Sequence, residues 1–214
     1  MSGKGHRDGM IIVLSGASGS GKTTLARRLV EMVPGLEKSI SYTTRKPRVD
    51  ETPGVAYHFV SVEEFQAMVK RKAFVEHAEV FGNHYGTSAE QIARRLDDGM
   101  DIICDIDVQG GAAVRKLFGK RSVLTFVLPP SWAELERRLR GRGTDADDVI
   151  ERRLNHARAE HKKASNYDYI VVNDDFSSAS AAVADIVRAE RMRTERARPT
   201  LPAGLIGPAP KQRG

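Results

Sequence analysis

Cysteine is almost absent from this sequence, since Cys104 is the only one in 214 residues. A single cysteine excludes an intramolecular disulfide framework and a metal site built from several thiolates. The first apolar run, residues 10–15, stops at Gly16 and is too short for a signal peptide or a membrane span. We therefore expect a cytoplasmic protein with no membrane partner.

An excess of charge of one sign is missing from the body of the chain. The net charge is +6 at pH 7, but it lies at the ends: residues 188–214 hold seven basic and two acidic side chains, and residues 1–10 hold two basic and one acidic. The 25 basic and 25 acidic residues between them balance. A basic face that follows a nucleic acid backbone would not show this balance, so we expect no nucleic acid partner.

A glycine-rich stretch is the most informative feature that is present. It reads Gly16-Ala17-Ser18-Gly19-Ser20-Gly21-Lys22-Thr23 and lies between an apolar run and a helix-like segment. The spacing G-x-x-x-x-G-K-S/T wraps backbone N–H groups around a phosphate, and it supplies a lysine for the β- and γ-phosphates and a hydroxyl for Mg²⁺. A chance match in a chain of this length is on the order of 1%. The stretch therefore predicts a phosphate-binding loop between a strand and a helix.

The remaining sequence predicts one body of alternating strands and helices. Capping boxes at Ser61, Ser88 and Ser131 mark three helix starts. The polar stretch 43–54 is longer than a connection in a compact domain needs, which is typical of a functional loop. Expected helices cover 22–33, 61–71, 88–99, 131–140, 145–165 and 177–196. Expected strands cover 37–42, 55–61, 74–81, 84–87, 100–107, 122–128 and 169–172.

Seven motifs in this order resemble the guanylate kinase family over roughly residues 10–190. Besides the phosphate loop, they are 39–48, 54–61, 74–78, 82–88, 105–110 and 138–144. Ala17 stands where many members have proline and Thr87 where some have serine, and neither change removes a donor or a charge. The resemblance implies a three-layer α/β fold with a parallel sheet of the P-loop NTPase type, an inserted mixed β/α GMP-binding lobe and a helical lid.

The resemblance also implies a division of the chain. The core is expected over 10–36, 88–137 and 166–196, the GMP-binding lobe over 37–87 and the lid over about 138–165. Residues 1–9 and the Arg- and Pro-rich tail 197–214 are expected to be disordered. The implied reaction phosphorylates GMP, and also dGMP, with ATP and Mg²⁺.

The acceptor site needs phosphate donors at one end and groups that read a base edge at the other. Two arginines on a loop can fork onto a phosphate, with tyrosine hydroxyls as neutral donors. A carboxylate can accept guanine's N1–H and N2–H, and hydroxyls can donate to its O6. The residues expected to bind GMP are Ser41, Arg45, Arg48, Tyr57, Glu76, Tyr85, Thr87 and Asp107.

The donor site is expected around the phosphate loop. The residues expected to bind ATP are Gly16, Ala17, Ser18, Gly19, Ser20, Gly21, Lys22, Thr23, Thr24 and, for the adenine, Asn173. Thr23 is expected to hold Mg²⁺, with Asp105 acting through water. The residues expected to act on the transferring phosphoryl group are Lys22, Arg45, Arg138, Arg142 and Arg153.

Two alternatives stay open on the sequence. A guanylate-kinase-like scaffold module binds proteins through the former nucleotide lobe, but such modules lose the loop lysine and glycines that are present here. A related kinase could act on AMP, dTMP or a non-nucleotide acceptor instead. The residues expected to bind the guanine edge distinguish a GMP kinase from these related kinases.

Overall fold

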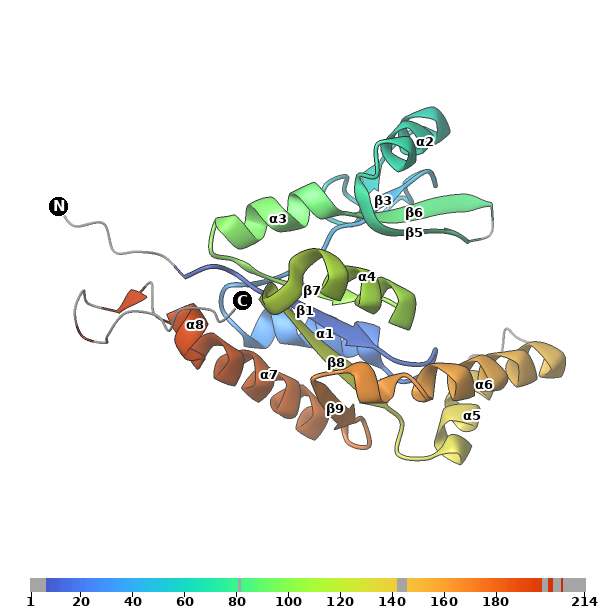
Figure 1. Cartoon of the computed structure of the whole chain (residues 1–214). Coiled ribbons are helices and arrows are strands. Elements are labelled where there is room, and N and C mark those ends of the chain that lie inside the picture. Colours follow the sequence, from blue (N-terminus) through green and yellow to red (C-terminus); the bar gives the residue numbers. More distant parts are fainter. Residues whose placement is uncertain (1–6, 81, 142–145, 198–199, 202–204, 206–214) are drawn as a thin grey trace.

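A parallel sheet of five strands forms the centre of the molecule (Figure 1), for which a computed structural model describes residues 7–80, 82–141, 146–197, 200–201 and 205. The strand order is β2-β7-β1-β8-β9, and every neighbouring pair is parallel. The strands are β1 (Ile11–Ser15), β2 (Leu36–Lys38), β7 (Asp101–Asp105), β8 (Ser122–Leu128) and β9 (Tyr169–Val172). Their carboxyl ends share one edge, where ligands bind in folds of this kind.

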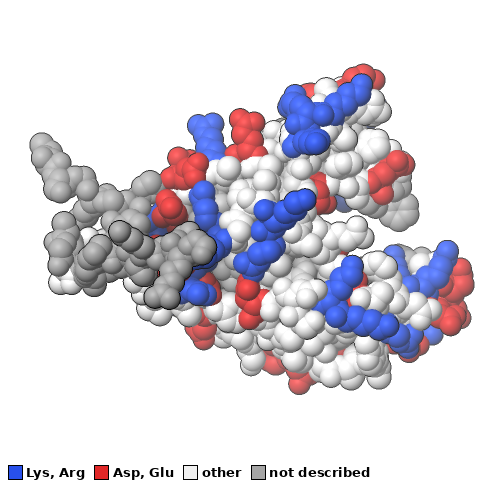
Figure 2. All heavy atoms as spheres, in the orientation of Figure 1, with Lys and Arg blue, Asp and Glu red and all other residues white. Residues whose placement is uncertain are grey.

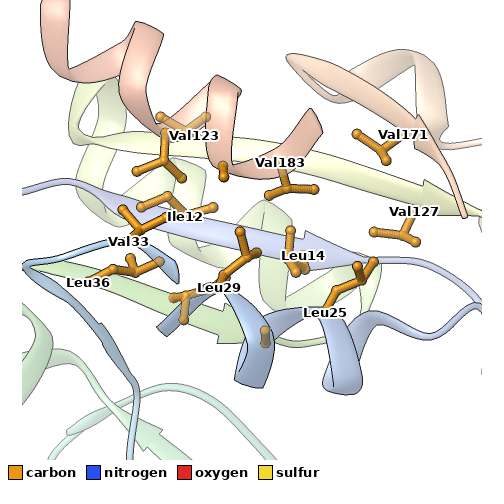
Figure 3. Close-up of a cluster of buried hydrophobic side chains, with 14 of the residues drawn as sticks. Ile12, Leu14, Leu25, Leu29, Val33, Leu36, Val123, Val127, Val171 and Val183 are labelled. Atoms are coloured by element: carbon orange, nitrogen blue, oxygen red, sulfur yellow. The ribbon is translucent and has the colours of Figure 1, made fainter. Parts of the chain in front are cut away.

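Helices cover both faces of this sheet, which explains why its strands are continuous apolar runs. Ile12 and Leu14 of β1 pack with α1 (Lys22–Met32) and α7 (Phe176–Met192) in the cluster that Figure 3 shows. Ile11 and Val13 point to the opposite face, toward α3 (Ala89–Asp97) and α4 (Val108–Phe118). This alternation follows the two-residue period of a strand.

A second, mixed sheet lies beside the first. Its strands are β3 (Tyr42–Thr43), β4 (His58–Phe59), β5 (Phe74–Val80) and β6 (Asn83–Ser88), in the order β4-β3-β6-β5. β3 pairs parallel with β4 and antiparallel with β6, and β5 and β6 form an antiparallel pair. Helix α2 (Val62–Lys70) covers it through Phe65, whose ring stacks on Phe74 with the centroids 4.6 Å apart.

Two further helices, α5 (Trp132–Arg140) and α6 (Asp147–His161), pack against the phosphate loop. Ala17 of the loop lies in one buried cluster with Leu135 and Leu139 of α5. The Trp132 ring lies 4.5 Å from the His161 ring, so the start of α5 contacts the end of α6. The Arg158 guanidinium lies 5.6 Å from the Trp132 ring centroid. The remaining elements are η1 (Gly119–Arg121), η2 (Ala164–Asn166) and α8 (Thr194–Ala197).

Two buried carboxylates tie the ends of the chain to the sheet. Asp101 is fully buried and accepts hydrogen bonds from Arg7, from Arg191 and from the backbone of Met10. Glu190 is 3% exposed and accepts from the Tyr169 hydroxyl and from Arg196. Both are paired with arginine, as a buried charge must be.

The expected fold class is confirmed, but three elements differ from the sequence prediction. The strand expected over 55–61 is only β4, at His58–Phe59. The strand expected over 37–42 is wrong: β2 ends at Lys38 in the central sheet, and β3 begins at Tyr42 in the second sheet. Helix α4 was not among the expected elements. No helix in the described ranges is long and apolar enough to cross a membrane.

Candidate active site

The phosphate loop connects the end of β1 to the start of α1. Three of its glycines, Gly16, Gly19 and Gly21, have φ of 146°, 90° and 93°, a region that side chains disfavour. A Cβ at Gly16 would also lie 2.3 Å from the carbonyl oxygen of Val127. The glycines therefore permit both the backbone path and its close packing on β8.

Lys22 is the first residue of α1, and its Nζ donates to the carbonyl oxygens of Gly16 and Ala17 at 2.9 and 3.4 Å. The ammonium thus lies over the loop, beside the positive end of the α1 dipole. Thr23 and Thr24 follow in the first turn and are exposed. This arrangement suits a chain of phosphates.

Asp105 ends β7, whose residues pair with β1 in the register Leu14 to Asp105. Its carboxylate therefore lies at the same edge of the sheet as the phosphate loop, and Lys38 Nζ is 3.6 Å from its Oδ1. Among the described residues, no group of three or more His, Cys, Asp or Glu could hold a metal ion. A hard cation here needs oxygens from water and a bound phosphate besides Thr23 and Asp105, which is how Mg²⁺ binds with nucleotides.

A hollow of about 260 Å³ lies between the second sheet and the end of β7. Its residues come from β5, β6, β7 and the segments that follow β2 and β7: Ser39, Ser41, Glu76, Thr87, Cys104, Asp105, Ile106 and Asp107. Four of the expected GMP-binding residues, Ser41, Glu76, Thr87 and Asp107, are thereby brought together. Figure 2 shows the molecular surface indented between the second sheet and the α5–α6 pair, and Lys and Arg are interspersed with Asp and Glu on the face shown.

Glu76 is the central carboxylate of this hollow. The Thr87 hydroxyl donates to its Oε1 at 2.6 Å, across the β5–β6 pair. Burial raises the pKa of Glu76 above its ordinary value, and the charge of Asp107 adds to the rise, while the Thr87 hydrogen bond opposes it. A Cβ at Gly110 would lie 3.2 Å from Cγ of Glu76, so a glycine at the start of α4 leaves the space that Glu76 uses.

Asp107 has a second, structural part in the site. It is the N-cap of α4, and its Oδ1 accepts from the backbone N–H groups of Gln109 and Gly110 at 2.9 and 2.8 Å. An N-cap of this type stabilises the start of a helix and fixes the direction of the carboxylate.

Arg45 is held on the polar loop by Glu51, a residue that the sequence analysis did not single out. Its Nη2 donates to both carboxylate oxygens of Glu51 at 2.7 and 2.9 Å, and the backbone N–H of Arg48 donates to Oε2. This hydrogen-bonded pair raises the pKa of Arg45 and lowers the pKa of Glu51. The Arg45 guanidinium also lies 5.5 Å from the centroid of the Tyr57 ring, so the loop is ordered around this side chain.

The remaining expected phosphate ligands lie close to Arg45. The Tyr57 and Tyr85 rings are 5.9 Å apart, on the strand side of the loop. The Arg48 side chain is exposed. Arginine and two phenols in one place form a site for an anion with several oxygens.

On α5, Glu134 holds the neighbouring arginines. Its carboxylate accepts from Arg137 at 2.7 Å and from Arg138 Nε at 2.7 Å, and these two partners lower the pKa of Glu134 to about 2. Arg138 Nη2 also donates to the carbonyl oxygen of Asn173 at 3.0 Å. Arg138 therefore lies against the end of β9, beside the phosphate loop.

Three further residues were expected at the donor site. Arg153 is half-buried on α6, and Arg142 lies outside the described residues. Asn173 is 6% exposed, and its side chain contacts the phosphate loop. Three residues of the site were missed from the sequence: Ser39, Glu51 and Glu134. For Glu51, the available signal was an acidic residue within a basic loop.

Comparisons with known proteins agree on one family. Residues 8–190 match the family model described as guanylate kinase. The guanylate kinase of Neisseria gonorrhoeae is 48% identical over 89% of this chain and 93% of its own length, and that of Escherichia coli K12 is 47% identical over 88% and 91%. The crystal structure of guanylate kinase from Anaplasma phagocytophilum has a TM-score of 0.69 and 36% identity, covering 89% of this chain and 90% of that one.

Proposed function

The chain belongs to the guanylate kinase family, and we propose that it transfers the γ-phosphoryl group of ATP to GMP, or to dGMP, giving ADP and the nucleoside diphosphate. It is a nucleotide kinase. The observation that carries the choice of acceptor is Glu76, which is half-buried, lines the hollow of about 260 Å³ and is paired with the Thr87 hydroxyl. The hollow is lined by Asp105, which ends β7 at the same sheet edge as the phosphate loop, so that donor and acceptor can meet there.

The donor side depends on positioning and on neutralisation of charge, since phosphoryl transfer needs no covalent intermediate on the protein. The loop N–H groups and the Lys22 ammonium bind the β- and γ-phosphates of ATP. Thr23 and Asp105 hold Mg²⁺, Asp105 through water. The ion, when bound, neutralises developing charge on the phosphate oxygens.

On the acceptor side, Arg45 and Arg48 bind the phosphate of GMP with the hydroxyls of Tyr57 and Tyr85. The Arg45 guanidinium has five donors in a planar fork: Nη2 donates to Glu51 and Nη1 donates to the carbonyl oxygen of Lys46 at 2.8 Å, and these bonds do not use all five. The ion pair therefore fixes the plane of the fork and leaves other N–H groups for the phosphate. Because Arg45 bears a charge at any physiological pH, the phosphate site is permanently cationic.

The base is read by hydrogen bonds on one edge. The Glu76 carboxylate accepts from guanine's N1–H and N2–H, and Asp107 supplies a further acceptor. The hydroxyls of Ser41 and Thr87 donate to O6. Thr87 donates to Glu76 in the structure, and rotation of its hydroxyl is enough to redirect that proton to the base.

The α5–α6 region acts as a lid over the transferring group. Arg138 already lies beside the phosphate loop, and Arg142 and Arg153 act with it on the equatorial oxygens. The corresponding division is a core of 10–36, 88–137 and 166–196, a GMP-binding lobe of 37–87 and a lid of about 138–165. The thiol of Cys104 is buried and forms no disulfide, which is consistent with a protein that functions in the cytoplasm.

The two alternatives from the sequence are disfavoured by particular residues. A non-catalytic scaffold has no need of Lys22 or of the three glycines with positive φ, yet all four are present and shaped into a loop. A kinase for AMP would have to place adenine's N1 acceptor against the Glu76 carboxylate, where two acceptors repel.

A coupled assay of phosphoryl transfer from ATP to GMP, dGMP, AMP and UMP tests the proposal. We expect activity on GMP and dGMP, and on AMP a kcat/KM lower by about 10⁴, because a site built for specific hydrogen bonds rejects a mismatched analogue strongly. Lys22→Ala should lower kcat severely and leave the KM for GMP nearly unchanged.

Lys70→Ala is the matched control, since Lys70 lies at the end of α2, away from the phosphate loop. AMP phosphorylated as well as GMP would contradict the guanine assignment. An equal loss of GMP affinity in Lys22→Ala would contradict the division between donor and acceptor sides.

A further inference from the structure

Lys38 is a cation beside the active site that no motif in the sequence singled out. It is the last residue of β2, the edge strand of the central sheet next to β7. The register places Lys38 opposite Ile103, so Asp105 lies two residues further along β7 on the same face of the sheet. The four-carbon stem of the lysine covers that step, and its Nζ lies 3.6 Å from Oδ1 of Asp105.

The face that Asp105 shares with Ile103 is the face that α1 covers. Ile103 lies in one buried cluster with Leu25 and Leu29 of α1. That helix carries Thr23 in its first turn. Because β7 lies next to β1 and ends at the same edge, Asp105 lies on the side of the phosphate loop, where the Mg²⁺ proposed above would bind.

Asp105 also lines the acceptor hollow, which is acidic. Glu76, Asp105 and Asp107 are among its eight lining residues, and none of the eight is Lys or Arg. Burial raises the pKa of Tyr57, a proposed phosphate ligand, and the charge of Asp105 adds to that rise. The carboxylate of Asp105 therefore reaches the place proposed for the phosphate of GMP. A dianionic phosphate is repelled there unless a cation offsets the charge of Asp105.

The contact between Lys38 and Asp105 is loose enough to be exchanged. At 3.6 Å it is an ion pair without a hydrogen bond, since an N–H···O bond measures up to about 3.2 Å. The Lys38 side chain is 42% exposed, so its ammonium can move into water on a flexible stem. Within the described ranges, Lys38 is the one cationic side chain paired with this carboxylate.

We propose that Lys38 is an exchangeable counter-ion for Asp105: it offsets the charge of the carboxylate before Mg²⁺ binds, and it competes with Mg²⁺ for that carboxylate when the ion arrives with the nucleotide. This role rests on the proposed kinase function, which supplies both the ion and the dianionic acceptor. A carboxylate already offset by one cation attracts a second one less strongly. Lys38 therefore favours GMP in the metal-free site and disfavours the metal, and both effects act through Asp105.

The test compares the wild type with Lys38→Met, which keeps the length of the side chain without its charge, and with Lys38→Arg, which keeps the charge. Calorimetric titration with GMP in the presence of a chelator measures acceptor binding without metal. Electron paramagnetic resonance of free Mn²⁺, titrated into the protein–ADP complex, measures the affinity for the metal, with Mn²⁺ as the probe. Lys70→Met is the matched control, since Lys70 is exposed at the end of α2 and its loss changes the net charge equally.

We expect Lys38→Met to weaken GMP binding without metal by roughly fivefold, because Asp105 is left without its counter-ion. The same variant should tighten Mn²⁺ binding by roughly fivefold, because the competing cation is gone. Lys38→Arg should keep both affinities within about twofold of the wild type. In an Asp105→Asn background, Lys38→Met should no longer tighten Mn²⁺ binding, since the two substitutions act on one pair.

Three results would overturn the proposal. Loss of both affinities in Lys38→Met, together with a lower melting temperature, would make the lysine a structural support of β2. Unchanged affinities for GMP and Mn²⁺ would make the pair a surface contact without a role. Tighter Mn²⁺ binding that persists in the Asp105→Asn background, or that Lys70→Met reproduces, would show that Lys38 does not act through Asp105. Undetectable GMP binding in the wild type would contradict the proposed acceptor instead, and the Mn²⁺ titration would still decide whether Lys38 competes with the metal.

Discussion

The half-buried carboxyl of Glu76 has a raised pKa, and this should link guanine binding to pH. Burial favours the protonated form, so the carboxylate that accepts from guanine is lost as the pH falls through a pKa above the ordinary value of about 4.3. Above that pKa the acceptor is fully present. GMP affinity should therefore rise with pH across this range.

The first residue-scale experiment is Glu76→Gln, with the KM for GMP measured from pH 5 to pH 8. Glutamine is uncharged throughout, so we expect its KM to exceed that of the wild type by roughly 10- to 100-fold at pH 8, and the difference to narrow as the pH falls toward the raised pKa of Glu76. Ionisation of the GMP phosphate, with a pKa of about 6, affects both proteins and serves as the internal reference. Equal KM values for the two proteins at pH 8 would remove Glu76 from base recognition.

Single residues of the site could be predicted from the sequence wherever a motif fixes their neighbours. Ser41, Glu76, Thr87 and Asp107 line one hollow, as their positions in the motifs implied. Glu51 could not be predicted in the same way, because its pairing with Arg45 depends on how the loop closes on itself. The roles assigned to these residues stay predictions until they are tested.

Helix α5 is the element that connects the proposed lid to the phosphate loop. Leu135 and Leu139 are almost fully buried with Ala17, and a Cβ at Gly19 would lie 3.1 Å from Cδ1 of Leu135 and 3.4 Å from Cδ2 of Leu139. The backbone of the loop thus rests directly on two leucines. A change in the packing of α5 should reach the nucleotide through this contact.

The element-scale experiment compares two buried leucines. Leu139→Ala and Leu96→Ala should each lower the free energy of unfolding by about 2–5 kcal/mol, which urea titration measures. Only Leu139→Ala should also raise the KM for ATP, because Leu96 packs on the other face of the sheet, in the cluster with Ile11 and Val13. If both variants altered ATP binding equally, the effect would be one of overall stability.

The elements that sequence reasoning missed have identifiable causes. Helix α4 begins with Gly110 and Gly111 in its first turn, which are poor helix formers, and tertiary packing of Val108 and Val114 overrides that propensity. The strand expected over 37–42 has the right composition, but the chain leaves the central sheet after Lys38 and enters the other sheet at Tyr42. Composition shows that a segment is extended and does not show which sheet it joins.

At the scale of the whole molecule, the layers were predictable and the anchoring of the termini was not. Continuous apolar strands alternating with amphipathic helices indicate a covered parallel sheet. Arg7 and Arg196 lie near the ends of the described chain, yet they donate to the buried carboxylates Asp101 and Glu190. The Arg7–Asp101 pair joins residues 94 positions apart and has no local sequence signal, and the Arg196–Glu190 pair, six positions apart, depends on the turn between α7 and α8.

A truncation and a substitution test the tail and the Arg196–Glu190 pair separately. Deleting residues 199–214 should leave the melting temperature and kcat nearly unchanged, since no core packing is expected from them. Arg196→Ala should lower stability by about 1–3 kcal/mol, because Glu190 and the carbonyl of Lys120 lose a donor. Thermal unfolding of the two variants beside Arg188→Ala, whose exposed partner is Asp185, measures the difference. A large loss in the truncated protein would show that the tail docks on the body.

The contact between Trp132 and His161 has a practical consequence. Trp132 is the single tryptophan of the chain and is 42% exposed, and its ring touches the last residue of α6 from the first residue of α5. All indole emission of the protein therefore originates where α5 begins and α6 ends, next to an imidazole and a guanidinium. The molecule carries its own fluorophore, and a stopped-flow trace on mixing with nucleotide should record a movement of α5 against α6 without a label.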